Sequence, residues 1–394
     1  MKKELATHKI SQEIFALVDQ GTWSMLSLLA TAFYIQNNAL SDVGKFSLVL
    51  AFTYCNLSIL RTYLMFPIIS ESVMLNVENS RDFSKKIFKP LMKILFVELL
   101  IFGMILQINL QDARQVVDFI IIVIALTSRD ISRSINIYFD RCAKNILQNT
   151  IGILTLTLFV VAKPISLTIL EIWTLALLVT FVPIPIDRKH LVSRTIQNRS
   201  SRPLTFKQTK LLRFDSLILQ LMNVLTLALF TKLDSTLVGK YMIAYTCIAS
   251  VAMTVGSGIT GKLHLQYLRE QTKEVEIFKR YLITILILLI NSCLMLSVDF
   301  LPELLVGTNW DAANEVFFPT LLLCLTVILV QFYAFPLLAN TSMIHFIVFR
   351  ILSFFGINIL PYLFMILFSL GLTLFCQIIF FFTILIFARR SVRV

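Results

Sequence analysis

Long apolar segments recur along the whole chain and are separated by short polar segments. They lie near residues 13–35, 45–69, 90–108, 116–137, 146–162 and 168–186, and then near 214–231, 240–261, 280–298, 315–338, 343–360 and 362–387. Most approach the roughly 20 residues that an α-helix needs to cross about 30 Å of hydrocarbon. The pattern therefore predicts about twelve transmembrane helices, with the last break between helices at Pro361.

The composition agrees with a chain that is solvated by lipid. Hydrophobic residues make up 57% of the chain, charged residues make up only 15%, and the mean hydropathy is +0.82. Soluble domains carry about 25% charged residues. The net charge of +12 does not indicate a nucleic-acid partner, because the basic residues lie between the apolar segments and do not form one patch. We expect an all-α integral membrane protein.

The sequence contains no pattern that predicts a catalytic centre, a metal site or a bound cofactor. The six cysteines and four histidines are dispersed without metal-ligand spacing. Residues 256–262 match most of a phosphate-binding loop, but Leu263 stands where that motif needs Ser or Thr, and no strand precedes it. We expect that the protein is not an enzyme.

The loops differ in basic charge in a way that predicts the topology. Lysine and arginine concentrate in alternate polar segments, at residues 2–9, 81–89, 141–144, 188–213, 262–280 and 389–393. Cytoplasmic loops carry such an excess of basic residues. Both termini are therefore expected in the cytoplasm, together with the basic segment 187–213.

Short motifs near the start of the first and second halves match each other in order. Val43-Gly-Lys-Phe46 opens the second predicted helix, and Val238-Gly-Lys-Tyr241 opens the eighth. Six helices per repeat place both repeats in the same orientation, related by an axis along the membrane normal. We predict two parallel six-helix bundles around a central cavity: an N-terminal lobe (1–186), a cytoplasmic connector (187–213) and a C-terminal lobe (214–394).

Several arginines lie within the apolar segments, where a charge costs about 2.5–3.5 kcal/mol on insertion scales and usually faces a partner or a water-filled cavity. Arg129 and Arg133 fall on one face of the fourth predicted helix. This excess of cations over deep carboxylates predicts an anionic cargo, such as a phosphate or an acidic sugar. The candidate cargo-binding residues are Arg61, Arg129, Arg133 and Arg350.

Polar side chains also follow one face of the first and seventh predicted helices, and they predict a polar lining of the cavity. An alternative holds for two of the charged groups: Asp19 could pair with an arginine and hold helices together, and Arg133 could be a cytoplasmic-end residue. The predicted lining residues are Asp19, Gln20, Ser24, Ser27, Gln220 and Asn223.

Three segments resemble the polysaccharide and O-antigen flippases of the multidrug/oligosaccharidyl-lipid/polysaccharide (MOP) exporter superfamily. They are Leu17-Val-Asp-Gln-Gly-Thr-Trp-Ser-Met-Leu-Ser-Leu, Ser41-Asp-Val-Gly-Lys-Phe-Ser-Leu and Leu301-Pro-Glu-Leu-Leu-Val-Gly-Thr-Asn-Trp-Asp-Ala-Ala. The resemblance implies a MATE-like fold in the bacterial inner membrane with a cationic cavity that alternates access between the two sides. It further implies flipping of an undecaprenyl-diphosphate-linked oligosaccharide, with membrane lipid, a polysaccharide polymerase and a chain-length regulator as partners.

Two other functions stay open at this point. A cation-coupled exporter of small molecules or drugs on the same fold would use Asp19 to bind a driving ion, H⁺ or Na⁺. A membrane protein of envelope assembly that transports nothing is the third alternative. The excess of buried arginine argues against cationic drugs as cargo, and the missing catalytic cluster argues against an envelope enzyme.

Overall fold

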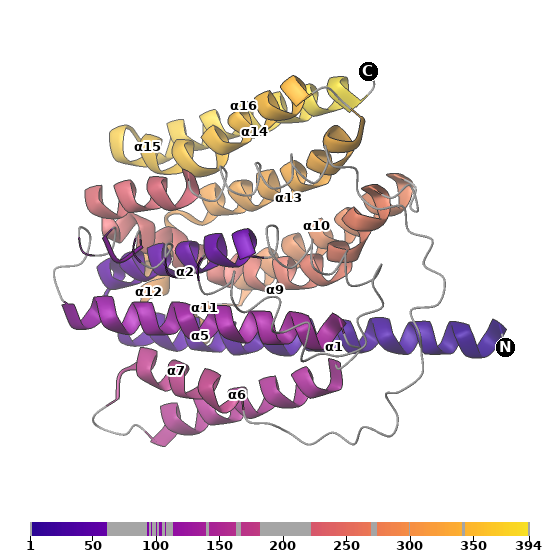
Figure 1. Ribbon diagram of the computed structural model, residues 1–394. Helices are drawn as coiled ribbons and strands as arrows, with labels where there is room; N and C mark the ends of the chain where they lie inside the picture. Colours follow the sequence, from indigo (N-terminus) through magenta and orange to yellow (C-terminus); the bar gives the residue numbers. More distant parts are fainter. Residues whose placement is uncertain are drawn as a thin grey trace. The chain divides into compact units, whose positions relative to one another are not determined.

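The computed structural model describes residues 2–60, 93, 96, 100, 102–104, 107, 113–138, 142–162, 167–181, 222–268, 274–298, 300–340 and 343–392. These residues form helices and short turns (Figure 1). The helices are α1 (Lys2–Asn37), α2 (Leu40–Leu60), α5 (Ala113–Tyr138), α6 (Cys142–Ala162), α7 (Ile169–Val179), α9 (Ser235–Leu268), α10 (Glu274–Ser297), α11 (Phe300–Val306), α12 (Asn309–Asn314), α13 (Phe317–Asn340), α14 (Met343–Phe354), the π-helix η3 (Phe355–Ile359), α15 (Leu360–Leu367) and α16 (Leu370–Val392). A further apolar helix covers Met222–Leu233. Short turns follow α1, α10, α11, α12 and α15.

Within the described ranges, four helices are long and apolar enough to cross a membrane by length and composition. They are Cys142–Ala162, Phe317–Ala334, His345–Leu367 and Leu370–Arg389, and the bent pair Tyr281–Ser297 with Phe300–Val306 makes a fifth if it counts as one span. The predicted all-α membrane class is therefore confirmed.

Helix α6 shows what solvates the outer surface of the helices. Its polar residues Asn145 and Asn149 are buried, whereas Leu154, Leu158 and Val161 are mostly exposed. A surface helix of a soluble protein has the opposite arrangement, with its polar face outward. An exposed apolar face and a buried polar face are what a lipid environment requires.

The predicted break at Pro361 is wrong. The helix that begins at Met343 continues through η3 and α15 to Leu367, and the chain turns at Phe368 and Ser369 before α16 begins. The Leu360 N–H donates to the carbonyl of Phe355, five residues earlier, which is the π-helical pattern. Pro361 then follows in the first turn of α15, where its missing N–H is tolerated.

The chain divides into two compact units. Unit 1 contains Met1–Ala30 and Asn56–Pro203, and unit 2 contains Thr31–Cys55 and Leu204–Val394. Helices α1 and α2 each contribute to both units. The predicted connector 187–213 lies outside the described residues, so the division into lobes at that segment stays a prediction.

In unit 1, helices α5, α6 and α7 pack against one another (Figure 1). Helix α7 begins at Thr168 with a capping box: the Thr168 N–H donates to the Glu171 carboxylate, and the Glu171 N–H donates to the Thr168 hydroxyl. Gly152 of α6 makes a close approach to α7 possible, because a Cβ there would lie 2.8 Å from Thr180 Cγ2 and 3.4 Å from the Ala176 carbonyl oxygen. This packing fixes the buried polar face of α6 against its neighbours.

In unit 2, α9 packs against α10, α12 and α13, while α13 packs against α14 and α16. A cluster of buried apolar side chains lies between α13, α14 and α16, and it consists of Val330, Ala334, Phe346, Phe349, Ile384 and Ala388.

Candidate functional site

Four charged side chains are buried together in unit 1, on helices α1 and α5. Asp19 and Arg129 have no exposed surface, Asp130 is 1% exposed and Arg133 is 5% exposed. Charged residues are almost never fully buried unless they are paired or bind a ligand. This buried charge cluster is therefore the candidate functional site of the described residues.

Asp19 and Arg133 form an ion pair that joins α1 to α5. The Nε of Arg133 donates to Asp19 Oδ2 at 2.9 Å, and its Nη2 donates to Gln20 Oε1 at 2.6 Å. Asp130 lies one turn from Arg133, with 3.8 Å between its Oδ1 and Arg133 Nη1. Arg133 thus contacts two carboxylates and one amide, which compensate for the loss of its hydration.

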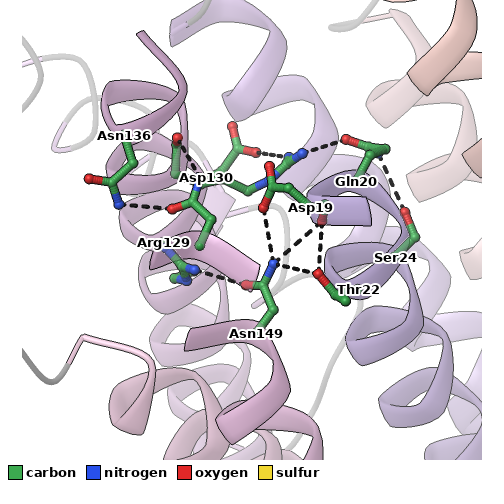
Figure 2. A network of polar contacts seen from close by, with 10 residues as sticks. Asp19, Gln20, Thr22, Ser24, Arg129, Asp130, Asn136 and Asn149 are labelled. Carbon is green, nitrogen blue, oxygen red and sulfur yellow. Dashed lines mark hydrogen bonds and ion pairs between the residues drawn. The ribbon is translucent and has the colours of Figure 1, made fainter. Parts of the chain in front are cut away.

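Helix α6 connects to the same cluster through asparagine side chains (Figure 2). The Asn149 amide donates to Asp19 Oδ1 at 3.3 Å and to Thr22 Oγ1 at 3.2 Å, and its oxygen accepts from Arg129 Nη2 at 2.8 Å. Asn145 donates to the Arg133 carbonyl and accepts from Asn136. Asn149 therefore couples the carboxylate of Asp19 to the guanidinium of Arg129.

Arg129 retains donor capacity that no described residue uses. Among the described residues, no hydrogen-bond acceptor lies within reach of its Nε or its Nη1, although the side chain is completely buried. Buried donors without a partner cost about 1–3 kcal/mol each, and more for a charged group. In native sites, a bound water, ion or ligand is one of the partners that can supply the missing acceptor.

The structure places the remaining predicted residues as follows. Gln20 donates to Ser24 at 3.4 Å, and the Ser27 hydroxyl donates to the Trp23 carbonyl on its own helix. Arg350 is half-buried in unit 2, with its guanidinium carbon 5.4 Å from the ring centre of Phe346. The described residues bring together the following predicted site residues: Asp19, Gln20, Ser24, Arg129 and Arg133.

Three other predicted residues either belong to unit 2 or lie outside the described residues. Asn223 belongs to unit 2, in the helix Met222–Leu233. Arg61 and Gln220 lie outside the described residues. The common cavity lined from both halves of the chain stays a prediction.

The sequence analysis missed Asp130, Asn145 and Asn149 as members of the site. Their signal was present, because Asn145, Gln148 and Asn149 recur at helical spacing in an otherwise apolar segment and all three are buried. Asp130 directly follows Arg129 in the sequence, and the prediction considered only the arginines of this helix.

Two other candidate sites carry no support from the geometry. The glycine-rich segment 256–262 lies within the continuous helix α9 and does not form a loop that could surround a phosphate. In the described part of the chain, no group of three or more His, Cys, Asp or Glu side chains is arranged to hold a metal ion.

Comparisons with known proteins identify the fold. No family model matches the chain. No curated protein matches it either. Two solved structures match over 98% of the chain at 13% sequence identity: "MATE in the bent conformation", with a TM-score of 0.58 and 94% of that chain covered, and "MATE in complex with MaD3S", with a TM-score of 0.53 and 95% covered. The chain therefore has the MATE fold, as the sequence predicts.

Proposed function

We propose that this protein with the MATE fold is a membrane transporter that works by alternating access, and that its cargo is an undecaprenyl-diphosphate-linked oligosaccharide. The fold supports a transport function and not an enzymatic one, since both matching structures carry the name MATE. The observation that supports an anionic cargo is Arg129, a buried guanidinium with two nitrogens, Nε and Nη1, that find no acceptor among the described residues. Both termini are placed in the cytoplasm under this proposal, by the positive-inside rule.

A guanidinium suits a diphosphate for geometric and electrostatic reasons. Its planar donors match phosphate oxygens, and charge-assisted hydrogen bonds are roughly twice as strong as neutral ones. Burial increases the attraction between opposite charges because little water screens them. Arg129 would then contact the diphosphate directly, and Asn149 would hold the guanidinium in place through its 2.8 Å hydrogen bond.

A cation-coupled exporter of small molecules is the second candidate, and one observation favours it. Asp19 and Asp130 lie beside Arg129 and Arg133, so the buried cluster contains two carboxylates for two guanidinium groups. The excess of cations that the sequence suggests is therefore absent from this cluster. A balanced cluster could accept a driving cation at a carboxylate.

Deletion of the gene separates the two candidates. Under our proposal the deletion strain loses a surface polysaccharide, keeps its lipid-linked repeat unit on the cytoplasmic leaflet, and shows unchanged sensitivity to cationic dyes. Expression of the wild-type chain should restore the polysaccharide. Arg129→Gln should restore at most about a tenth of it, a loss of about 1.4 kcal/mol in cargo recognition.

The matched control is Lys232→Gln, which removes one positive charge from an exposed position and should restore the polysaccharide fully. Membrane levels of both variants are measured alongside. Intact surface polysaccharide in the deletion strain together with hypersensitivity to cationic dyes would favour the exporter and contradict the flippase.

A further inference from the structure

We infer that the crossing of α2 and α9 is an outer gate, held closed in this structure by backbone contacts at two glycines. The crossing is formed by Leu40 and Gly44 of α2 and by Ser235 and Gly239 of α9. This inference rests on the proposed alternating-access transport. All four residues belong to unit 2, and the charge distribution assigns this end of both helices to the outside.

The two helices touch through their backbones, because neither glycine has a side chain. A Cβ on Gly44 would lie 1.9 Å from the Ser235 carbonyl oxygen, and a Cβ on Gly239 would lie 2.1 Å from the Leu40 carbonyl oxygen. Small residues at a helix crossing allow such close approach in membranes. Any larger residue would force the helices apart at this point.

The contact is also symmetric between the two repeats. Gly44 and Gly239 occupy the same position in the motifs Val43-Gly-Lys-Phe46 and Val238-Gly-Lys-Tyr241. Each glycine lies against a backbone carbonyl in the first turn of the other helix. The contact is therefore self-complementary, as in a two-fold interface. A contact of this kind between repeat-related helices is expected on the pseudo-axis that relates the two repeats.

Reciprocal side-chain hydrogen bonds tie the same end of α1 to the segment that contains α11 and α12. The Gln36 amide donates to the carbonyls of Leu304 and Leu305, at 2.7 and 3.2 Å. In return, the Asn309 amide donates to the carbonyls of Ile35 and Asn38, at 2.7 and 3.3 Å. Each hydrogen bond of this type contributes little net free energy. The set of four can therefore hold this end closed and still break when it opens.

The division of the chain into units supports a gating role for these contacts. Residues 31–55 come from the first half of the sequence but group with the second half, and α1 and α2 leave unit 2 at Thr31 and Cys55. A transporter that alternates access must separate its halves at the end that it opens. The glycine crossing and the amide ties are the contacts that would break when cargo leaves to the outside.

Labelling from outside intact cells tests the gate without a transport assay. Val43→Cys places a thiol at a fully buried position of α2 beside the crossing. Adding Gly239→Val to it should raise the rate of labelling of Cys at position 43 by a membrane-impermeant maleimide about tenfold or more, which corresponds to about 1.4 kcal/mol. The reciprocal pair, Val238→Cys with Gly44→Val, should behave in the same way.

The matched control is Gly371→Val, at a glycine whose added Cβ would meet nothing within 4 Å. It should leave labelling at position 43 unchanged. Peptide mapping also reads the native thiol of Cys324, which is fully buried in α13 and should stay unlabelled in a folded variant. Unchanged labelling at position 43 in the Gly239→Val chain, with Cys324 protected, would overturn the gate.

A second arm decides the question if the valine variants unfold. An ideal Cβ on Gly307 lies 4.0 Å from Gln36 Cα, so Gln36→Cys with Gly307→Cys should cross-link on mild oxidation. The oxidised pair should lose surface-polysaccharide export and recover it on reduction, whereas the export by Gln36→Cys alone, whatever its level, should not differ between the two states. Equal export by the oxidised and reduced pair would overturn the gate, while absence of export by the wild-type chain would count only against the proposed function.

Discussion

Removing the Asp19 carboxylate should destabilise the protein, because it leaves the Arg133 guanidinium buried with fewer acceptors. Breaking one partner of a buried ion pair typically costs about 3–5 kcal/mol. Arg133 would keep Gln20 Oε1 at 2.6 Å and Asp130 at 3.8 Å, and an asparagine at position 19 preserves an acceptor near Arg133. We therefore expect Asp19→Asn to cost about 3 kcal/mol, at the lower end of that range.

A double-mutant cycle measures the pair itself. The free energy of unfolding in mixed detergent micelles is compared for the wild-type chain, Asp19→Asn, Arg133→Gln and the double variant. Because the two groups are in direct contact, the costs of the single changes should not add, and the coupling should be about 1–3 kcal/mol. Additive costs within about 0.5 kcal/mol would show that the pair does not hold α1 to α5, and the reasoning would fail.

Three further predictions concern packing, capping and cargo. Gly152→Val should lower the free energy of unfolding of the purified protein by about 1–3 kcal/mol, because the added side chain overpacks against Thr180. Gly21→Val places its side chain in open space and should lower the melting temperature less in the same thermal scan. Asp234 caps α9 by accepting the Leu237 N–H; burial raises its pKa, but this is outweighed by hydrogen bonds from Thr236 and Leu237 and by the charge of Lys240, so the pKa lies below its ordinary value. The stabilisation that the Asp234 carboxylate contributes is therefore complete above its unfolded-state pKa of about 3.9. It is lost as the pH falls through the lower folded-state pKa. A pH series of melting temperatures should show this loss for the wild-type chain, and Asp234→Asn should lack this contribution. Arg350→Lys should retain part of polysaccharide export and Arg350→Glu should abolish it at normal membrane levels, so full export by the glutamate variant would show that Arg350 does not contact the cargo.

The ends of a helix could be predicted from the sequence where polar residues stand on both sides of an apolar segment. The predicted spans 116–137 and 146–162 agree with α5 and α6 to within a few residues. The prediction failed at Pro361, since a local rule about proline cannot anticipate that a π-helical turn before it lets the helix continue. The true break at Phe368 and Ser369 has no proline or glycine at its centre, although Gly371 follows it in α16.

The members of the buried cluster were only partly predictable. Arg129 and Arg133 stand out because a charge within an apolar segment needs a reason. Their partners do not stand out, because the sequence does not show which neighbouring helix supplies Asp19 or Asn149. Only the packing of α1, α5 and α6 reveals that the arginines meet two carboxylates and several amides. The expectation of an unbalanced cationic site followed from that missing information.

The glycine crossing shows a different limit. The two Val-Gly-Lys motifs were visible as a repeat, and they predicted related positions in the two halves. Nothing in either motif says that the two copies touch each other. That contact depends on the positions of Leu40 and Ser235, whose carbonyl oxygens face the opposite glycine.

The most direct test of the central claim is flipping by the purified protein in vesicles. Wild-type protein is reconstituted into liposomes that contain an undecaprenyl-diphosphate-linked oligosaccharide on the inner leaflet, and a lectin added outside measures the appearance of sugar on the outer leaflet. We predict lectin binding that rises with time for the wild-type chain and for Lys232→Gln, and a rate about tenfold lower or less for Arg129→Gln. A rate equal to that of protein-free liposomes, in vesicles where the same protein moves a cationic dye, would contradict the account.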